Sequence, residues 1–112
     1  LERERAAAEH ESRSFVRQAF MRYLGIEGDE LDPDVQFAVV RGWLQHLAAG
    51  DALQLLVTLE DLLQERVPQN VPGTVDERPN WRRKTSLDFE SLCNYPRVAD
   101  TLLTIDKTRQ TR

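Results

Sequence analysis

Residues 53–59 read Leu-Gln-Leu-Leu-Val-Thr-Leu, and this short apolar run determines whether the chain contains a sheet. An almost continuous apolar run of this length, with valine and threonine, favours a strand buried on both faces, as in a parallel sheet. Periodicity alone does not separate such a strand from a buried helix, which would make the chain a small helical bundle. Because one strand cannot form a sheet, the strand interpretation requires a partner outside this chain or in a second copy of it.

Two long helices are predicted before this run. Residues 1–24 contain no proline or glycine, and their apolar residues follow the helical period toward the end, where Gly25 stops the helix. A second helix begins at the Asp32-Pro33 pair, with the aspartate as N-cap and the proline in the first turn, and it ends at Gly50.

Two shorter helices are predicted near the end of the sequence. One has its apolar residues between positions 87 and 92 and Ser86 as its cap, and the other has its apolar residues between positions 98 and 105 and Pro96 in its first turn. We therefore expect a mainly α fold with one or two short strands.

A long segment without apolar periodicity separates the two halves of the chain. Residues 64–85 contain three prolines together with Gly73. A loop of this length in a compact domain is usually functional or disordered. The total length favours a single domain over residues 1–112, with residues 64–85 as a long loop.

Composition excludes several classes of partner. The chain has 15 basic and 19 acidic residues, a net charge of −4, which disfavours binding to nucleic acid or to an anionic membrane. No apolar run is long enough for a membrane span, and we expect no signal peptide. The single cysteine, Cys93, excludes an internal disulfide and a cysteine-rich zinc site, and it fits a reducing, cytoplasmic location.

No group of residues in the sequence predicts catalysis, a metal site or a cofactor. Cys93 is interpreted as a small buried hydrophobic residue, and His10 and His46 are isolated histidines without acidic partners at ligand spacing. Glu60 and Asp61 are adjacent, so in a strand they would point to opposite faces and could not flank one glycosidic bond.

Residues 78–84, Arg-Pro-Asn-Trp-Arg-Arg-Lys, combine an aromatic residue with four cations. Such residues could bind a nucleic acid by stacking and phosphate contacts, or a sugar ring by stacking of Trp81. In a purely structural alternative, Trp81 anchors the loop and the cations are solvated. The acidic net charge makes the nucleic-acid alternative the weakest of the three.

Three motifs resemble a known family in their order and spacing. They are Leu59-Glu60-Asp61-Leu62-Leu63, Asn70-Val71-Pro72-Gly73-Thr74 and Pro79-Asn80-Trp81-Arg82. The combination resembles the C-terminal part of amylomaltases, which are 4-alpha-glucanotransferases. The resemblance is close over residues 53–84, loose beyond Thr85, and limited to the kind of element in the upstream helices.

The resemblance implies a particular fold and reaction. It implies that the chain is the C-terminal βα portion of a (β/α)8 TIM barrel, with the loop at the active-site end of the last strand. The reaction implied is a retaining transfer of α-1,4-glucan segments, with a glycosyl-enzyme intermediate on a carboxylate. The family's catalytic carboxylates belong to earlier strands with a Thr-His-Asp segment that this sequence lacks, so the isolated chain is expected to be inactive.

The resemblance also implies substrate-binding residues and partners. Asn70 and Gly73 match residues of the family's substrate-binding loop, and Trp81 matches a tryptophan that either touches glucan or anchors the loop. The implied partners are an α-1,4-glucan or maltooligosaccharide and the remainder of the parent barrel, with self-association through uncovered apolar surfaces. The alternative function is a helical protein-interaction module without catalysis.

Overall fold

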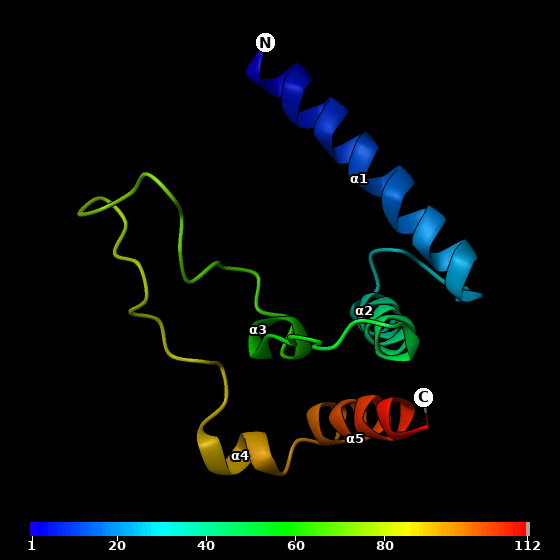
Figure 1. Ribbon diagram of the computed structural model, residues 1–112. Coiled ribbons are helices and arrows are strands. Elements are labelled where there is room, and N and C mark those ends of the chain that lie inside the picture. Colours follow the sequence, from blue (N-terminus) through cyan, green and yellow to red (C-terminus); the bar gives the residue numbers. More distant parts are fainter. Residues whose placement is uncertain (112) are drawn as a thin grey trace.

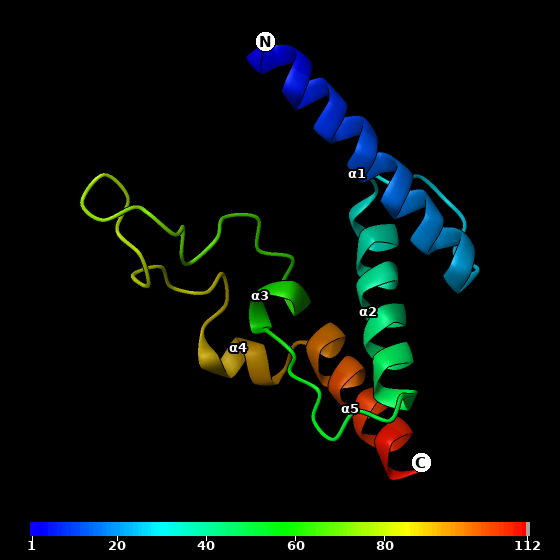
Figure 2. The same cartoon turned by 45° about the horizontal axis from the view of Figure 1, so that its top comes forward.

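The computed structural model describes residues 1–111, and each regular element in that range is a helix (Figure 1). The long helices α1 and α5 both pack against α2, and α3 and α4 are single short turns beside them (Figure 2). The helices are α1 (Glu2–Leu24), α2 (Pro33–Ala49), α3 (Leu59–Leu62), α4 (Phe89–Cys93) and α5 (Pro96–Gln110).

The ends of the two long N-terminal helices confirm the predicted signals. Gly25 adopts a left-handed conformation (φ +67°), and its N–H donates to Arg22 O at 3.3 Å. The Ile26 N–H donates to Met21 O at 2.9 Å, which completes a Schellman motif. The Asp32 carboxylate accepts the Asp34 N–H at 2.8 Å, so Asp32 is the N-cap of α2 as predicted.

The cap of α4 differs from the prediction. Ser86 does not begin this helix, because it lies three residues before its start and its N–H donates to Glu65 at 2.8 Å. Asp88 is the N-cap, and its carboxylate accepts the Ser91 N–H at 2.8 Å. Hydrogen bonding from Ser91, first through its side chain and then through its backbone N–H, holds the pKa of Asp88 below its ordinary value.

The core is small and lies where α1, α3 and α5 meet α2. Ala48 is fully buried, and Leu62 and Thr101 are each 1% exposed. The buried hydroxyl of Thr101 donates a hydrogen bond to Arg97 O at 2.6 Å. The buried residues in the described range are Met21, Phe37, Ala48, Leu62, Val98, Thr101 and Ile105.

One arginine joins three elements around this core. Arg97, in the first turn of α5, forms an ion pair with Asp34 in the first turn of α2. Its guanidinium also lies 4.8 Å from the ring centroid of Phe37 in α2, and its Nη1 donates to Gln64 Oε1 at 3.1 Å. Arg97 therefore holds α2, α5 and the segment after α3 together.

The C-terminal half of α1 packs on α2 through aromatic and aliphatic contacts. The rings of Tyr23 and Trp43 are stacked with centroids 5.4 Å apart, and Phe20 meets Trp43 edge-on at 4.8 Å. A Cβ at Gly42 would lie 2.9 Å from Leu24 Cδ1, so the mid-helix glycine lets the two helices approach closely. The first twelve residues of α1, Glu2 to Arg13, are exposed, and this end of the helix projects away from the other helices (Figure 2).

The predicted strands, and with them the C-terminal βα portion of a (β/α)8 TIM barrel, are wrong. Between residues 1 and 111 there is no strand, and residues 53–58 are coil with Leu53 91% and Leu56 88% exposed. The Arg109 guanidinium binds Leu53 O at 2.8 Å, where a strand would need a neighbouring backbone N–H.

The alternative of a buried helix over the same run also fails. Thr58 is an N-cap, because its hydroxyl accepts the Asp61 N–H at 3.4 Å, and α3 therefore begins at Leu59. The apolar run predicted burial, but its leucines mostly face solvent and only the turn that follows it enters the core through Leu62.

No helix within residues 1–111 is long and apolar enough to cross a lipid bilayer.

Replacement of the most buried leucine tests this fold. We expect Leu62→Ala to lower the free energy of unfolding by about 2–5 kcal/mol, because it leaves a cavity at a fully packed position. The matched control Leu56→Ala should change it by less than about 0.5 kcal/mol, because that side chain is already in solvent. Urea unfolding measures both values. Equal decreases in the free energy of unfolding in the two variants would show that the apolar run is buried in solution and would contradict this fold.

Candidate functional site

A long loop over residues 64–88 joins α3 to α4 and extends away from the helices (Figure 1). Its first residue, Gln64, has a positive φ of 53° and donates from Nε2 to Pro33 O at 2.8 Å. Near its other end, the Ser86 N–H donates to the Glu65 carboxylate at 2.8 Å. The two ends of the loop therefore meet beside α3.

The carboxylate of Glu65 joins the two ends of the loop. Hydrogen bonds from Ser86, and secondarily the charge of Arg83 with Nη2 3.9 Å away, lower the pKa of Glu65 below its ordinary value of 4.5. Glu65 is therefore ionised at neutral pH, where it accepts from Ser86 most strongly.

Within the loop, residues Val71 to Thr74 form a tight turn. The Thr74 N–H donates to Val71 O at 3.2 Å, which closes a four-residue β-turn. Pro72 occupies the second position, and Gly73, with φ +84°, occupies the third. These features are typical of a type II turn, whose third position requires a positive φ and therefore favours glycine.

The side chain of Asn80 binds both flanks of this turn. Its Oδ1 accepts the Val71 N–H at 2.9 Å, and its Nδ2 donates to Thr74 O at 3.0 Å. The same Nδ2 donates to the Thr74 hydroxyl at 3.2 Å, and that hydroxyl donates to Val71 O at 2.7 Å. One asparagine thus cross-links the two arms of the loop.

The three predicted substrate-binding residues all lie in this cross-linked part of the loop. Asn70 and Trp81 are on opposite arms that are joined by the Trp81 N–H donating to Gln69 O at 2.8 Å. Trp81 is 74% exposed and has an unusual positive φ of 59°. A Cβ at Gly73 would meet nothing within 4 Å, so open space adjoins the turn.

A hollow of about 340 Å³ adjoins the same turn. Asp76 and Arg82 are among its lining residues, and carboxylate and guanidinium groups both hydrogen-bond readily to hydroxyl groups. The lining residues are Thr74, Val75, Asp76, Pro79, Asn80 and Arg82.

Sequence reasoning missed Thr74 and Asn80 as members of the site. Both lie inside the motifs that carry the family resemblance, but neither was assigned a role. The available signal was their residue type, because Asn and Thr side chains in turns bind nearby backbone groups.

The other candidate groups lie elsewhere and are not brought together. Cys93 is exposed on α4 and is therefore not the buried hydrophobic residue that the sequence predicted. His46 packs edge-on against the rings of Tyr23 and Trp43, with centroids 5.4 and 5.2 Å away. The described residues contain no cluster of three His, Cys, Asp or Glu side chains that could hold a metal ion.

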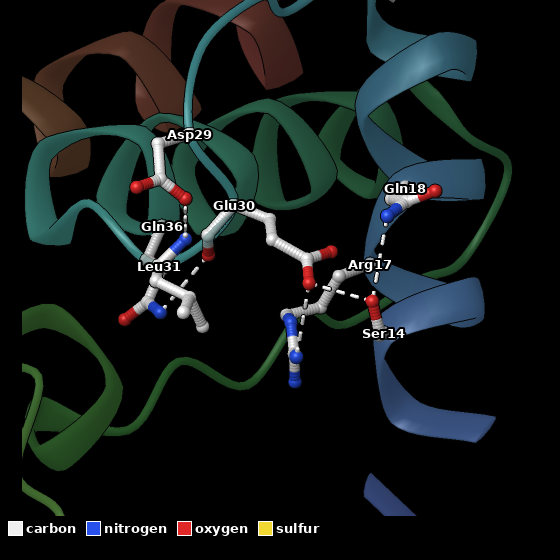
Figure 3. Close-up of polar contacts among 7 residues, drawn as sticks. All are labelled: Ser14, Arg17, Gln18, Asp29, Glu30, Leu31 and Gln36. Atoms are coloured by element: carbon white, nitrogen blue, oxygen red, sulfur yellow. Dashed lines mark hydrogen bonds and ion pairs between the residues drawn. The ribbon is translucent and has the colours of Figure 1, made fainter. Parts of the chain in front are cut away.

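A polar cluster joins α1 to the start of α2 (Figure 3). The Ser14 hydroxyl donates to Glu30 Oε1 at 2.6 Å, and Arg17 Nη2 lies 3.5 Å from the same oxygen. Gln36 in α2 donates to Glu30 O at 3.1 Å. The hydrogen bond from Ser14 is the largest cause that lowers the pKa of Glu30, and the charge of Arg17 adds to it against partial desolvation.

Comparison with known proteins gives one family. The family model for 4-alpha-glucanotransferases matches residues 5–88. The 4-alpha-glucanotransferases of Mycobacterium tuberculosis (strain H37Rv) and Mycobacterium bovis are each 40% identical to this chain over 78 residues, which is 67% of the chain. The aligned part is 11% of each relative's length, so the chain spans about a tenth of those relatives. No solved structure matches.

The Glu30 cluster predicts a dependence of stability on pH. Because the pKa of Glu30 is lowered by folding, its contribution is fully present above its ordinary value of 4.5 and is lost as the pH falls through the lowered value. We expect Glu30→Gln to lower the melting temperature at pH 7 and to have a much smaller effect in strong acid. Thermal unfolding followed by circular dichroism at both pH values measures this difference. A decrease in melting temperature that is equally large at both pH values would contradict this role of the Glu30 carboxylate.

Proposed function

This chain belongs to the 4-alpha-glucanotransferase family, and we propose that it is the C-terminal part of a protein that transfers segments of α-1,4-glucan. Its role there is to supply a sugar-binding loop, while the catalytic carboxylates belong to the rest of the parent protein. The substrate is an α-1,4-glucan or maltooligosaccharide, and the location is the cytoplasm.

The observation that carries the proposal is the arrangement of Asn70, Gly73 and Trp81 in one cross-linked loop. The exposed indole of Trp81 offers an apolar plane on which a sugar ring can stack. Asn70 is exposed on the opposite arm and supplies an amide that can donate to and accept from sugar hydroxyls. The open space at Gly73 allows a ligand to approach the backbone closely.

In this proposal the loop contributes binding and orientation, and no residue of this chain acts as acid, base or nucleophile. Retaining transfer needs two carboxyl groups about 5 Å apart across the scissile bond. Asp76 is the acidic residue that lines the loop's hollow, and Arg82 is the basic residue that lines it. That pair can orient hydroxyl groups but cannot form and release a glycosyl intermediate.

The rival function is a helical interaction module, and exposed apolar residues favour it. On α1, Phe15 is 69% exposed and Tyr23 is 65% exposed, and on α5 Leu103 is 55% exposed. Such surfaces support self-association or contact with the remainder of the parent protein.

A titration with maltoheptaose separates the two functions. The chain contains two tryptophans, so the indole N–H resonances give one reporter in the loop, Trp81, and one internal control, Trp43. We expect maltoheptaose to shift the Trp81 indole and the Asn70 amide and to leave Trp43 unchanged. Trp81→Ala should weaken binding about fivefold, which corresponds to about 1 kcal/mol of lost ring contact.

The matched variant Phe15→Ala removes an exposed aromatic residue of α1, outside the loop, and should leave the affinity unchanged. An absence of sugar-dependent shifts, together with a sedimentation coefficient that rises with protein concentration and falls in Phe15→Ala, would favour the interaction module instead.

The isolated chain should have no transferase activity. After incubation with maltotriose, chromatography should detect neither longer nor shorter maltooligosaccharides, because no carboxylate pair of this chain is assigned to the reaction. Product formation that persists in Asp76→Asn would overturn the division of roles, whereas its loss in that variant would make Asp76 part of the chemistry.

A further inference from the structure

The loop that carries the proposed sugar contacts has no apolar core of its own. Every buried residue in the described range lies outside residues 64–88, and both Val75 and Trp81 are about three-quarters exposed. A segment that buries so little apolar surface gains little from the hydrophobic effect to offset its conformational entropy. Its shape must therefore depend on hydrogen bonds and ion pairs.

The hydrogen bonds of Thr74 and Asn80 form one continuous chain. Asn80 Nδ2 donates to Thr74 Oγ1, and the single hydroxyl proton of Thr74 has its shortest acceptor in Val71 O at 2.7 Å. Asn80 Oδ1 accepts the Val71 N–H in return. Linked hydrogen bonds of this kind polarise and strengthen one another, so the loss of one group weakens the whole set.

This chain of hydrogen bonds acts directly on the proposed contact residues. Trp81 follows Asn80, and its left-handed backbone (φ +59°) is a conformation that persists only where the surroundings hold it. The bonds of Asn80 to the Val71–Thr74 turn and the bond of the Trp81 N–H to Gln69 O together restrain the backbone where it enters Trp81. The turn held by Asn80 also contains Gly73.

We propose that Thr74 and Asn80 are positioning residues that fix Asn70, Gly73 and Trp81 in the arrangement that binds glucan. This inference rests on the proposed function of the loop. Both side chains are half-buried, and every polar group on them already has a partner within the loop. They therefore act through their neighbours and not through hydrogen bonds of their own to the sugar.

Matched substitutions at Thr74 test the proposal. Thr74→Val keeps the shape of the side chain and removes the hydroxyl, whereas Thr74→Ser keeps the hydroxyl and removes only the methyl group. Thr85→Val is the control, because it removes a hydroxyl that donates to Leu87 O at 2.7 Å in the same loop but outside the cross-link. Asn80→Ala removes the other half of the network.

Two readouts are needed. Amide hydrogen exchange at Val71 and Trp81 reports the order of the loop without any ligand, and titration of the Trp81 indole with maltoheptaose reports binding. We expect Thr74→Val and Asn80→Ala to accelerate exchange at both amides at least tenfold and to weaken maltoheptaose binding at least fivefold. Thr74→Ser should stay within twofold of the original chain in both readouts, as should Thr85→Val.

The helical circular dichroism should be unchanged in all four variants, because the substituted residues lie outside the helices. Wild-type exchange and affinity in Thr74→Val and Asn80→Ala would overturn the inference, and so would faster exchange without loss of affinity. If the original chain gives no shift with maltoheptaose while exchange accelerates as expected, the proposed function fails and the ordering of the loop by Thr74 and Asn80 is supported.

Discussion

The contact of the Arg97 guanidinium with α2 is the interaction that links the packed helices to the long loop. The guanidinium pairs with the Asp34 carboxylate, lies over the ring of Phe37, and donates to the side chain of Gln64. An arginine suits this place because its planar, permanently charged group presents donors in several directions and an apolar face at the same time. Through Gln64, the helix packing is connected to the first residue of the long loop.

The helices and the loop are stabilised by different physical means. Leu62, Val98 and Ile105 are buried between helices, so hydrophobic burial holds that part of the molecule. The loop is held by directional bonds instead, with Glu65 and Ser86 at its base and Asn80 across its turn. Two of the three motifs that carry the family resemblance lie in the loop, which contributes no buried residue, whereas the third contains Leu62 of the hydrophobic core.

Much of the helical structure could be predicted from the sequence, because caps such as Gly25 and Asp32 are local signals. The strand prediction for residues 53–59 failed because apolar composition does not report whether a partner backbone is present, and here Arg109 binds the carbonyl of Leu53. The motif resemblance led to the correct family and to candidates such as Trp81. The pairing of Thr74 with Asn80 could not be predicted, since it depends on how two arms of coil approach each other in space.

The absence of buried residues from the long loop also has an evolutionary consequence. Substitutions at its exposed positions, such as Val75 or Arg82, remove no core contact and therefore cost the described helical scaffold little stability. Proteins near their stability threshold tolerate few changes that are both new in function and destabilising. A loop closed by its own side chains escapes that constraint, so selection can diversify its surface while the helices that carry it stay the same.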